Sequence, residues 1–102
     1  MTEKDFLEYV EALCKRPRMY TATGSFNEVT AFLEGYGAGA NVGERSYHSV
    51  FTSFHKWVVK KFGIPKEIIN WSEFRELFSS DIEALNNIPI LYKEYISKFE
   101  QT

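Results

Sequence analysis

Apolar residues recur every three or four positions along most of the chain, a spacing that is typical of amphipathic helices. The first helix is predicted to begin at a cap on Thr2 and to end at Arg16, because Pro17 disfavours the α conformation of the residue before it. A second helix is predicted to begin in the capping-box sequence Ser25–Glu28 and to end or bend at the glycines of segment 35–39.

The third predicted helix has the most regular apolar pattern. Its apolar positions are Tyr47, Val50, Phe51, Phe54, Trp57, Val58 and Phe62. Gly63 is predicted to cap its C-terminus, with Ile64 as the apolar contact, and Pro65 prevents the helix from continuing.

Three shorter patterns complete the chain. A helix over 71–78 is predicted with Asn70 or Ser72 as its cap, and a capping box opens a short turn of helix over 80–85. Pro89 suits the first position of a separate final helix. No segment alternates apolar and polar residues as a half-buried strand does. The predicted fold class is therefore all-α, a compact bundle of five or six helices.

The composition indicates one domain with an aromatic core. The 102 residues are the length of a single domain, so residues 1–102 are expected to share one core. Nine Phe, six Tyr and two Trp make up 17% of the chain. Because each aromatic side chain buries a large area, we expect these residues to form most of the core.

Cysteine usage and hydropathy indicate the compartment. The single cysteine, Cys14, cannot form an intramolecular disulfide. The N-terminal sequence is rich in acids and has no apolar signal-peptide stretch, and no apolar run is long enough to span a membrane. A soluble cytoplasmic protein without membrane contact is expected.

The net charge of −2 is unevenly distributed. Residues 1–14 carry four acids against one lysine, residues 15–66 carry eight bases against three acids, and residues 67–102 carry seven acids against three bases. The acidic ends either complement the basic middle within the fold or provide surfaces for a charged partner.

The residues with reactive side chains do not form a recognisable catalytic or metal-binding motif. His48 and His55 lie about 10.5 Å apart along a helix, too far to share one metal. We expect both to be partly exposed, and Cys14 to be a small buried hydrophobe on its apolar stripe. No metal, cofactor or enzymatic activity is predicted. An enzyme built around one of the histidines is the alternative.

Basic residues suggest a further function. Lys56, Lys60 and Lys61 lie on the third predicted helix, and Arg16 and Arg18 follow the first. Together they would form a stripe that contacts phosphates. A small nucleic-acid-binding regulator is therefore an alternative, although nucleic acid is the less favoured partner because the chain as a whole is acidic.

Three short motifs resemble a known group of proteins. They are Arg16-Pro17-x-Met19-Tyr20, Phe32-Leu33-x-Gly35-Tyr36 and Phe54-x-x-Trp57 followed by Gly63. This pattern resembles small helical bacterial proteins similar in kind to the immunity proteins of contact-dependent and other polymorphic toxin systems. The resemblance implies a non-catalytic protein that binds and neutralises a cognate bacterial toxin, with a nuclease as one candidate.

Segment 15–20 also has a specific structural interpretation. Pro17 would end a helix, Met19 and Tyr20 would lie beneath the following loop, and Arg16 or Arg18 would pair with an acid.

A toxin that acts on nucleic acid is expected to present a basic surface, which an acidic protein would block. The predicted contact residues are acids of the C-terminal third and two aromatic anchors expected to be exposed: Glu73, Glu76, Asp81, Glu83, Trp71 and Tyr92. Glu3, Glu8 and Glu11 form a second acidic face.

Overall fold

The computed structural model describes residues 3–40 and 51–100, which form five α-helices and one short 3₁₀ helix. The elements are α1 (Glu3–Lys15), η1 (Pro17–Met19), α2 (Phe26–Ala40), α3 (Thr52–Phe62), α4 (Trp71–Glu76) and α5 (Asp81–Glu100). The predicted all-α class is confirmed.

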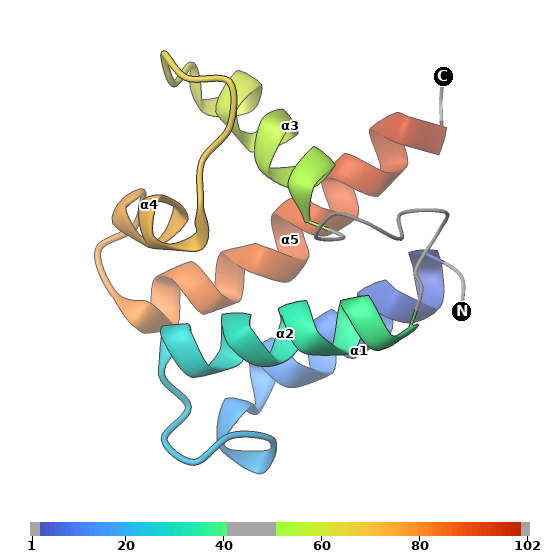
Figure 1. The fold of residues 1–102 in the computed structure, drawn as a ribbon, viewed down its shortest axis with the longest axis vertical. Coiled ribbons are helices and arrows are strands. Elements are labelled where there is room, and N and C mark those ends of the chain that lie inside the picture. Colours follow the sequence, from blue (N-terminus) through green and yellow to red (C-terminus); the bar gives the residue numbers. More distant parts are fainter. Residues whose placement is uncertain (1–2, 41–50, 101–102) are drawn as a thin grey trace.

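Helix α5 is the central element of the bundle. Figure 1 shows α5 running across the middle of the molecule, with α1 and α2 on one side and α3 and α4 on the other. Each of the other four helices contacts α5, and α1 contacts it most extensively. Side chains from all five helices form one core, whose largest fully buried members are Tyr92, Phe6, Phe26, Phe51, Phe54 and Phe74. The predicted aromatic core is therefore present.

Local sequence signals determine several helix ends as expected. The N–H of Arg16 still bonds to Ala12, and the chain then turns into η1 at Pro17. Gly63 takes a left-handed conformation with φ of 65°, and the N–H of Ile64 reaches back to the Val59 carbonyl. The α4 cap is Asn70, one of the two predicted candidates.

One prediction for the helices is wrong, and one alternative of a second prediction is excluded. Helix α2 continues through the glycines to Ala40, so it does not end at them. Helix α5 is one helix of 20 residues with Pro89 inside it, not a short turn followed by a separate helix. Proline within a helix costs about 3 kcal/mol, but Leu85, Ile88 and Tyr92 on either side of Pro89 are all buried in the same core. Burying such side chains stabilises the fold by about 1.5–3 kcal/mol each, which outweighs that cost.

Some expectations fall on parts of the chain that the structure does not describe. The predicted cap at Thr2, the apolar positions Tyr47 and Val50, and His48 lie outside the described residues.

Candidate functional site

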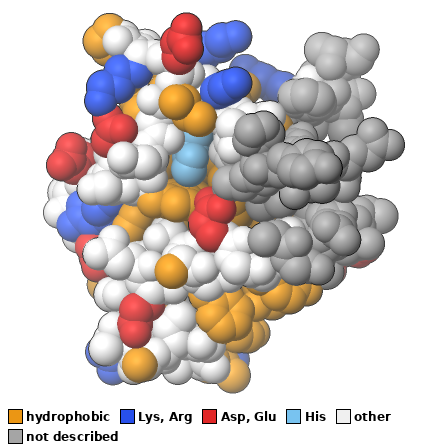
Figure 2. Space-filling view, viewed as in Figure 1, with side chains coloured by type: hydrophobic (Ala, Val, Ile, Leu, Met, Phe, Trp, Pro, Cys, Tyr) orange, Lys and Arg blue, Asp and Glu red, His pale blue; other side chains and the backbone are white. Residues whose placement is uncertain are grey.

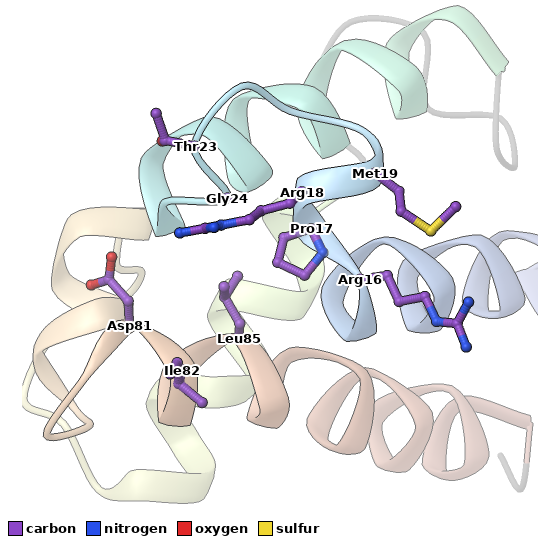
Figure 3. A pocket seen from close by; sticks show the side chains of 9 residues that line it. All are labelled: Arg16, Pro17, Arg18, Met19, Thr23, Gly24, Asp81, Ile82 and Leu85. Carbon is purple, nitrogen blue, oxygen red and sulfur yellow. The ribbon is translucent and has the colours of Figure 1, made fainter.

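A groove lies between η1 with its following loop and the first turns of α5. It has a volume of about 420 Å³, and we call it the η1–α5 groove. Figure 3 shows the side chains that line it: Arg16, Pro17, Arg18, Met19, Thr23, Gly24, Asp81, Ile82 and Leu85.

Local hydrogen bonds hold the η1 wall of the groove in shape. The backbone N–H and the hydroxyl of Thr21 both donate to the Pro17 carbonyl, at 3.0 Å each. The Gly24 N–H in turn donates to the Thr21 hydroxyl at 2.9 Å. The loop that follows η1 is therefore tied to the proline that ends the first helix.

Gly24 is required at this turn for two reasons. Its φ of 73° is unfavourable for other residues, and a Cβ placed on it would lie 2.9 Å from Cγ of Arg18. We expect Gly24→Ala to lower the free energy of unfolding by about 1–3 kcal/mol, measured by urea denaturation. Gly63→Ala is the matched control, since Gly63 has a similar φ of 65° and open space around it.

Gly63→Ala is expected to lose less stability than Gly24→Ala, because it adds backbone strain without a steric clash. Gly35 lies inside α2, and a Cβ placed on it would meet no neighbouring side chain or distant backbone within 4 Å. Gly35→Ala is therefore expected to raise the free energy of unfolding by about 0.5–1 kcal/mol. Equal losses for Gly24→Ala and Gly63→Ala would show that contact with Arg18 does not shape the loop.

The surface of the groove is apolar and unusually exposed. Met19 is 69% exposed and Ile82 is 72% exposed. The expectation that Met19 lies beneath a loop is therefore wrong. Large apolar side chains at such exposure are typical of surfaces that another molecule covers when they share one patch.

The two arginines of the groove are its charged side chains that form no ion pair within the described residues. Arg16 and Arg18 are exposed, and in Figure 3 their side chains leave η1 in opposite directions. Within residues 3–40 and 51–100, neither guanidinium forms an ion pair, contrary to the expectation that one would pair with an acid.

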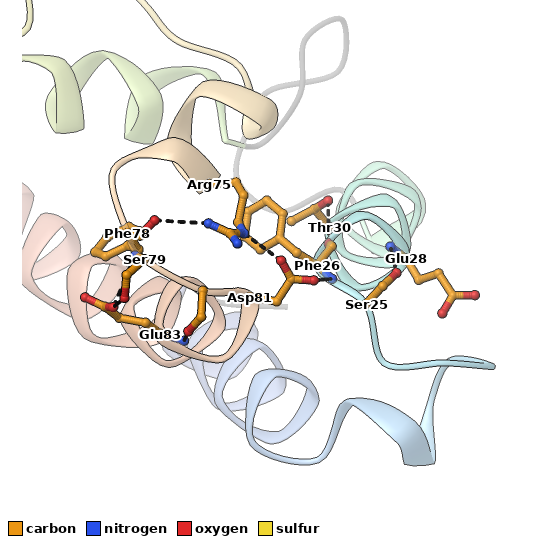
Figure 4. A network of polar contacts seen from close by, with 10 residues as sticks. Ser25, Phe26, Glu28, Thr30, Arg75, Phe78, Ser79, Asp81 and Glu83 are labelled. Atoms are coloured by element: carbon orange, nitrogen blue, oxygen red, sulfur yellow. Dashed lines mark hydrogen bonds and ion pairs between the residues drawn. The ribbon is translucent and has the colours of Figure 1, made fainter.

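The acid of the groove, Asp81, is already bound within the fold. Its Oδ1 accepts a hydrogen bond from Nε of Arg75 at 2.6 Å, and its Oδ2 accepts one from the Phe26 N–H at 3.2 Å (Figure 4). The Arg75 guanidinium and this N–H hold the pKa of Asp81 below its usual value. Asp81 thus caps the N-terminus of α2 from the start of α5.

Two other predicted contact acids also cap helices. Glu73 bonds to the Asn70 backbone N–H in a capping box and pairs with Lys66, which lowers its pKa. Glu83 accepts bonds from the hydroxyl and N–H of Ser79, which likewise lower its pKa.

Glu76 is exposed at the end of α4, and within the described residues it has no ion pair. The contact of these four acids with a partner stays a prediction.

The two predicted aromatic anchors differ in position. Trp71 is partly buried, and its indole N–H donates to Oε1 of Glu34 at 2.8 Å. Tyr92 is fully buried and packs against the rings of Phe6 and Phe54. The expectation that Tyr92 is exposed is wrong, because the face of α5 that carries it points into the core.

The basic residues of the alternative hypothesis do not form one stripe. Lys56 and Lys60 are exposed on α3, whereas Nζ of Lys61 is paired with Glu94 at 2.7 Å. Figure 1 shows α3 and η1 at opposite ends of the molecule, so the lysines and the two arginines are widely separated. Glu8 and Glu11 of the second acidic face are exposed on α1, the helix that Glu3 begins.

The two reactive side chains of the described residues lie in the core. His55 is 6% exposed, not partly exposed as expected, and its Nε2 has no partner within the described structure. Burial lowers the pKa of His55 to about 4 and raises that of the Cys14 thiol to about 12. Near neutral pH both groups are uncharged.

The described residues contain neither a metal-binding cluster nor a helix that could span a membrane. Within 3–40 and 51–100, no three His, Cys, Asp or Glu side chains lie close enough together to hold a metal ion. In the same ranges, no helix has the length and apolar character required to cross a membrane.

Two of the sequence motifs meet on one surface. The ring centroids of Tyr20 and Phe32 lie 6.3 Å apart, and Tyr36 stacks on Tyr9 at 3.7 Å. Figure 2 shows apolar side chains gathered on the α1–α2 side of the molecule. Burial and the neighbouring tyrosines raise the pKa of Tyr9. The segment at η1 is therefore partly structural, since Tyr20 fixes it against α1 and α2.

Met19 and Ile82 were not predicted to be surface residues, yet both are exposed. One signal was present for Ile82, which stands between two acids outside the apolar stripe of its helix. Comparison of the chain with protein-family models, curated proteins and solved structures finds no match.

Proposed function

We propose that this chain is a non-catalytic cytoplasmic immunity protein that binds and neutralises a cognate bacterial toxin, most specifically a basic toxin domain such as a nuclease. The observation that carries the proposal is the pair of exposed apolar side chains, Met19 and Ile82, in one groove that Asp81 also lines.

This arrangement supports a protein interface for a physical reason. Interfaces between proteins commonly have an apolar centre surrounded by polar and charged residues. Met19 and Ile82 would supply the centre, and the acids Glu76 and Glu83 would extend the contact over α4 and α5. Glu73, Asp81 and Trp71 complete the contact set in this proposal. An acidic rim would also speed association with a basic toxin.

The reactive groups support a binding role over catalysis. A general base works best with a pKa near the operating pH, and a cysteine nucleophile requires a thiolate. The pKa of His55 is lowered to about 4, and that of Cys14 is raised to about 12, so neither has the protonation behaviour these roles require.

The test is protection of cells by co-expression with the toxin domain encoded beside this chain's gene. The wild-type chain is expected to restore growth, and Ile82→Asp is expected to abolish protection. An apolar anchor at the centre of an interface is worth about 2 kcal/mol or more, so affinity should fall by at least about 30-fold in calorimetry.

The matched control is Ile90→Asp, the same substitution on the same helix at a residue that is 61% exposed and outside the groove. Both variants are expected to fold, because both isoleucine side chains are exposed. An acid at position 82 also lies near the α5 N-terminus, where negative charge is favourable. Cell death with the wild-type chain would refute the immunity function, and full protection by Ile82→Asp would refute the contact surface.

A further inference from the structure

The charge available in the η1–α5 groove is opposite to that of the acidic residues around it. Both carboxylate oxygens of Asp81 are bound, one to Arg75 and one to the Phe26 N–H. Arg16 and Arg18 line the same groove and form no ion pair within the described residues. An occupant of the groove therefore meets two guanidinium groups that have no carboxylate partner.

The apolar surface of the groove restricts the kind of occupant further. Pro17, Met19, Ile82 and Leu85 contribute apolar side chains to its lining, and its volume of about 420 Å³ has room for several side chains. A nucleic-acid backbone would pair with the arginines, but it would leave these apolar groups without apolar contacts. A protein segment with both apolar and acidic side chains satisfies both parts of the surface.

We propose that the η1–α5 groove binds an acidic, amphipathic segment of the partner protein. An apolar side chain of this segment contacts Met19 and Ile82, and carboxylates on either side of it pair with Arg16 and Arg18. Because the arginines leave η1 in opposite directions, the two carboxylates lie apart on the segment.

This inference rests on the proposed function, since it describes the part of the partner that the groove receives. The groove would also determine how the partner is oriented on this protein. The partner would present basic residues to Glu76 and Glu83 and acidic residues to η1. Complementary charges of opposite sign at two places on an interface fix the register of the partner.

The test is site-specific photocrosslinking in cells that produce the partner. Benzoylphenylalanine replaces Met19 or Ile82 in the full chain, with position 90 as the control, and mass spectrometry locates the crosslinked residue in the partner. The expected product from both groove positions joins an apolar stretch flanked by Asp or Glu. Position 90 is expected to give little product.

Charge reversal tests the role of the arginines. Arg16→Glu with Arg18→Glu is expected to lower the crosslink yield from position 82 by at least about tenfold, because two attractive contacts become repulsive. Lys56→Glu with Lys60→Glu is the matched control and is expected to leave the yield unchanged. Urea denaturation of both double variants checks that they fold.

The remaining outcomes separate the inference from the proposed function. A crosslink to a basic or neutral segment, to a second copy of this chain, or at no more than the control yield would overturn the groove proposal. If the toxin is neutralised but crosslinks only elsewhere, the function stands and the groove inference fails. If an acidic segment of a protein that is not a toxin is crosslinked, the groove inference stands and the immunity function fails.

Discussion

Phe54→Ala is expected to lower the free energy of unfolding by about 3–5 kcal/mol, the range found for removal of a large aromatic side chain from a core. Phe54 is fully buried on α3. Its ring centroid lies 5.4–6.3 Å from those of Phe51, His55, Trp57, Trp71, Phe74, Tyr92 and Tyr95. These rings come from α3, α4, α5 and the residue before α3, so they cannot all move in to fill the space that Phe54 leaves. The measurement is urea denaturation followed by circular dichroism.

Phe32→Ala is the matched control for this prediction. It removes the same atoms from a residue that is 39% exposed and whose ring centroid lies 6.4 Å from that of Tyr9 and 6.3 Å from that of Tyr20. We expect a loss that is smaller by at least about 1 kcal/mol, because part of the ring already faces water. Similar losses for the two variants would contradict the assignment of Phe54 to the centre of the core.

The helices were predictable because their signals are local. The cap at Asn70 and the left-handed turn at Gly63 each depend on residues within one helical turn. The aromatic core was predictable for a similar reason, since the apolar stripe of each helix must be buried against another. Phe54 could therefore be assigned to the core before any tertiary contact was known.

What could not be predicted depends on contacts between distant segments. Pro89 has a local preference for a helix start, and only burial on both sides of it keeps α5 continuous. Asp81 belongs to a local capping box by sequence, yet it caps α2, whose first residue is 55 positions away. Tyr92 could not be assigned to the core from its own helix, because its burial depends on Phe6 of α1 and Phe54 of α3.

The candidate site shows the same limit. The sequence singled out segment 15–20 and the acids of the C-terminal third. Residues 16–19 of that segment and one of those acids, Asp81, line the η1–α5 groove. No local signal predicts that Met19 and Ile82 line the same groove, because these residues are 63 positions apart and belong to different elements. The distribution of charge was equally hidden, since the bonds that occupy Asp81 come from α2 and α4.

The free energy of unfolding is expected to decrease as the pH is lowered, over the range between the unfolded-state and folded-state pKa values of His55. In the folded chain burial holds the pKa of His55 at about 4, whereas in the unfolded chain it is near the ordinary value of 6.5. Between these values the unfolded state binds a proton that the folded state does not, so acid favours unfolding. The expected loss is about 1.5 kcal/mol from pH 6.5 to pH 5 and about 3 kcal/mol by pH 4 relative to neutral pH.

His55→Leu isolates this effect, because leucine has a similar volume, does not titrate and removes the unpartnered Nε2. Urea denaturation of both chains at pH 7, 6.5, 6 and 5 is the measurement. The difference in free energy of unfolding between variant and wild type is expected to grow in favour of the variant as the pH falls.

The carboxylates with lowered pKa, such as Asp81 and Glu83, contribute stability that is lost at lower pH, as the pH falls below their unfolded values near 4. Because both chains share these acids, they cancel in the difference. A difference that stays constant from pH 7 to pH 5 would show that His55 is not buried in its neutral form.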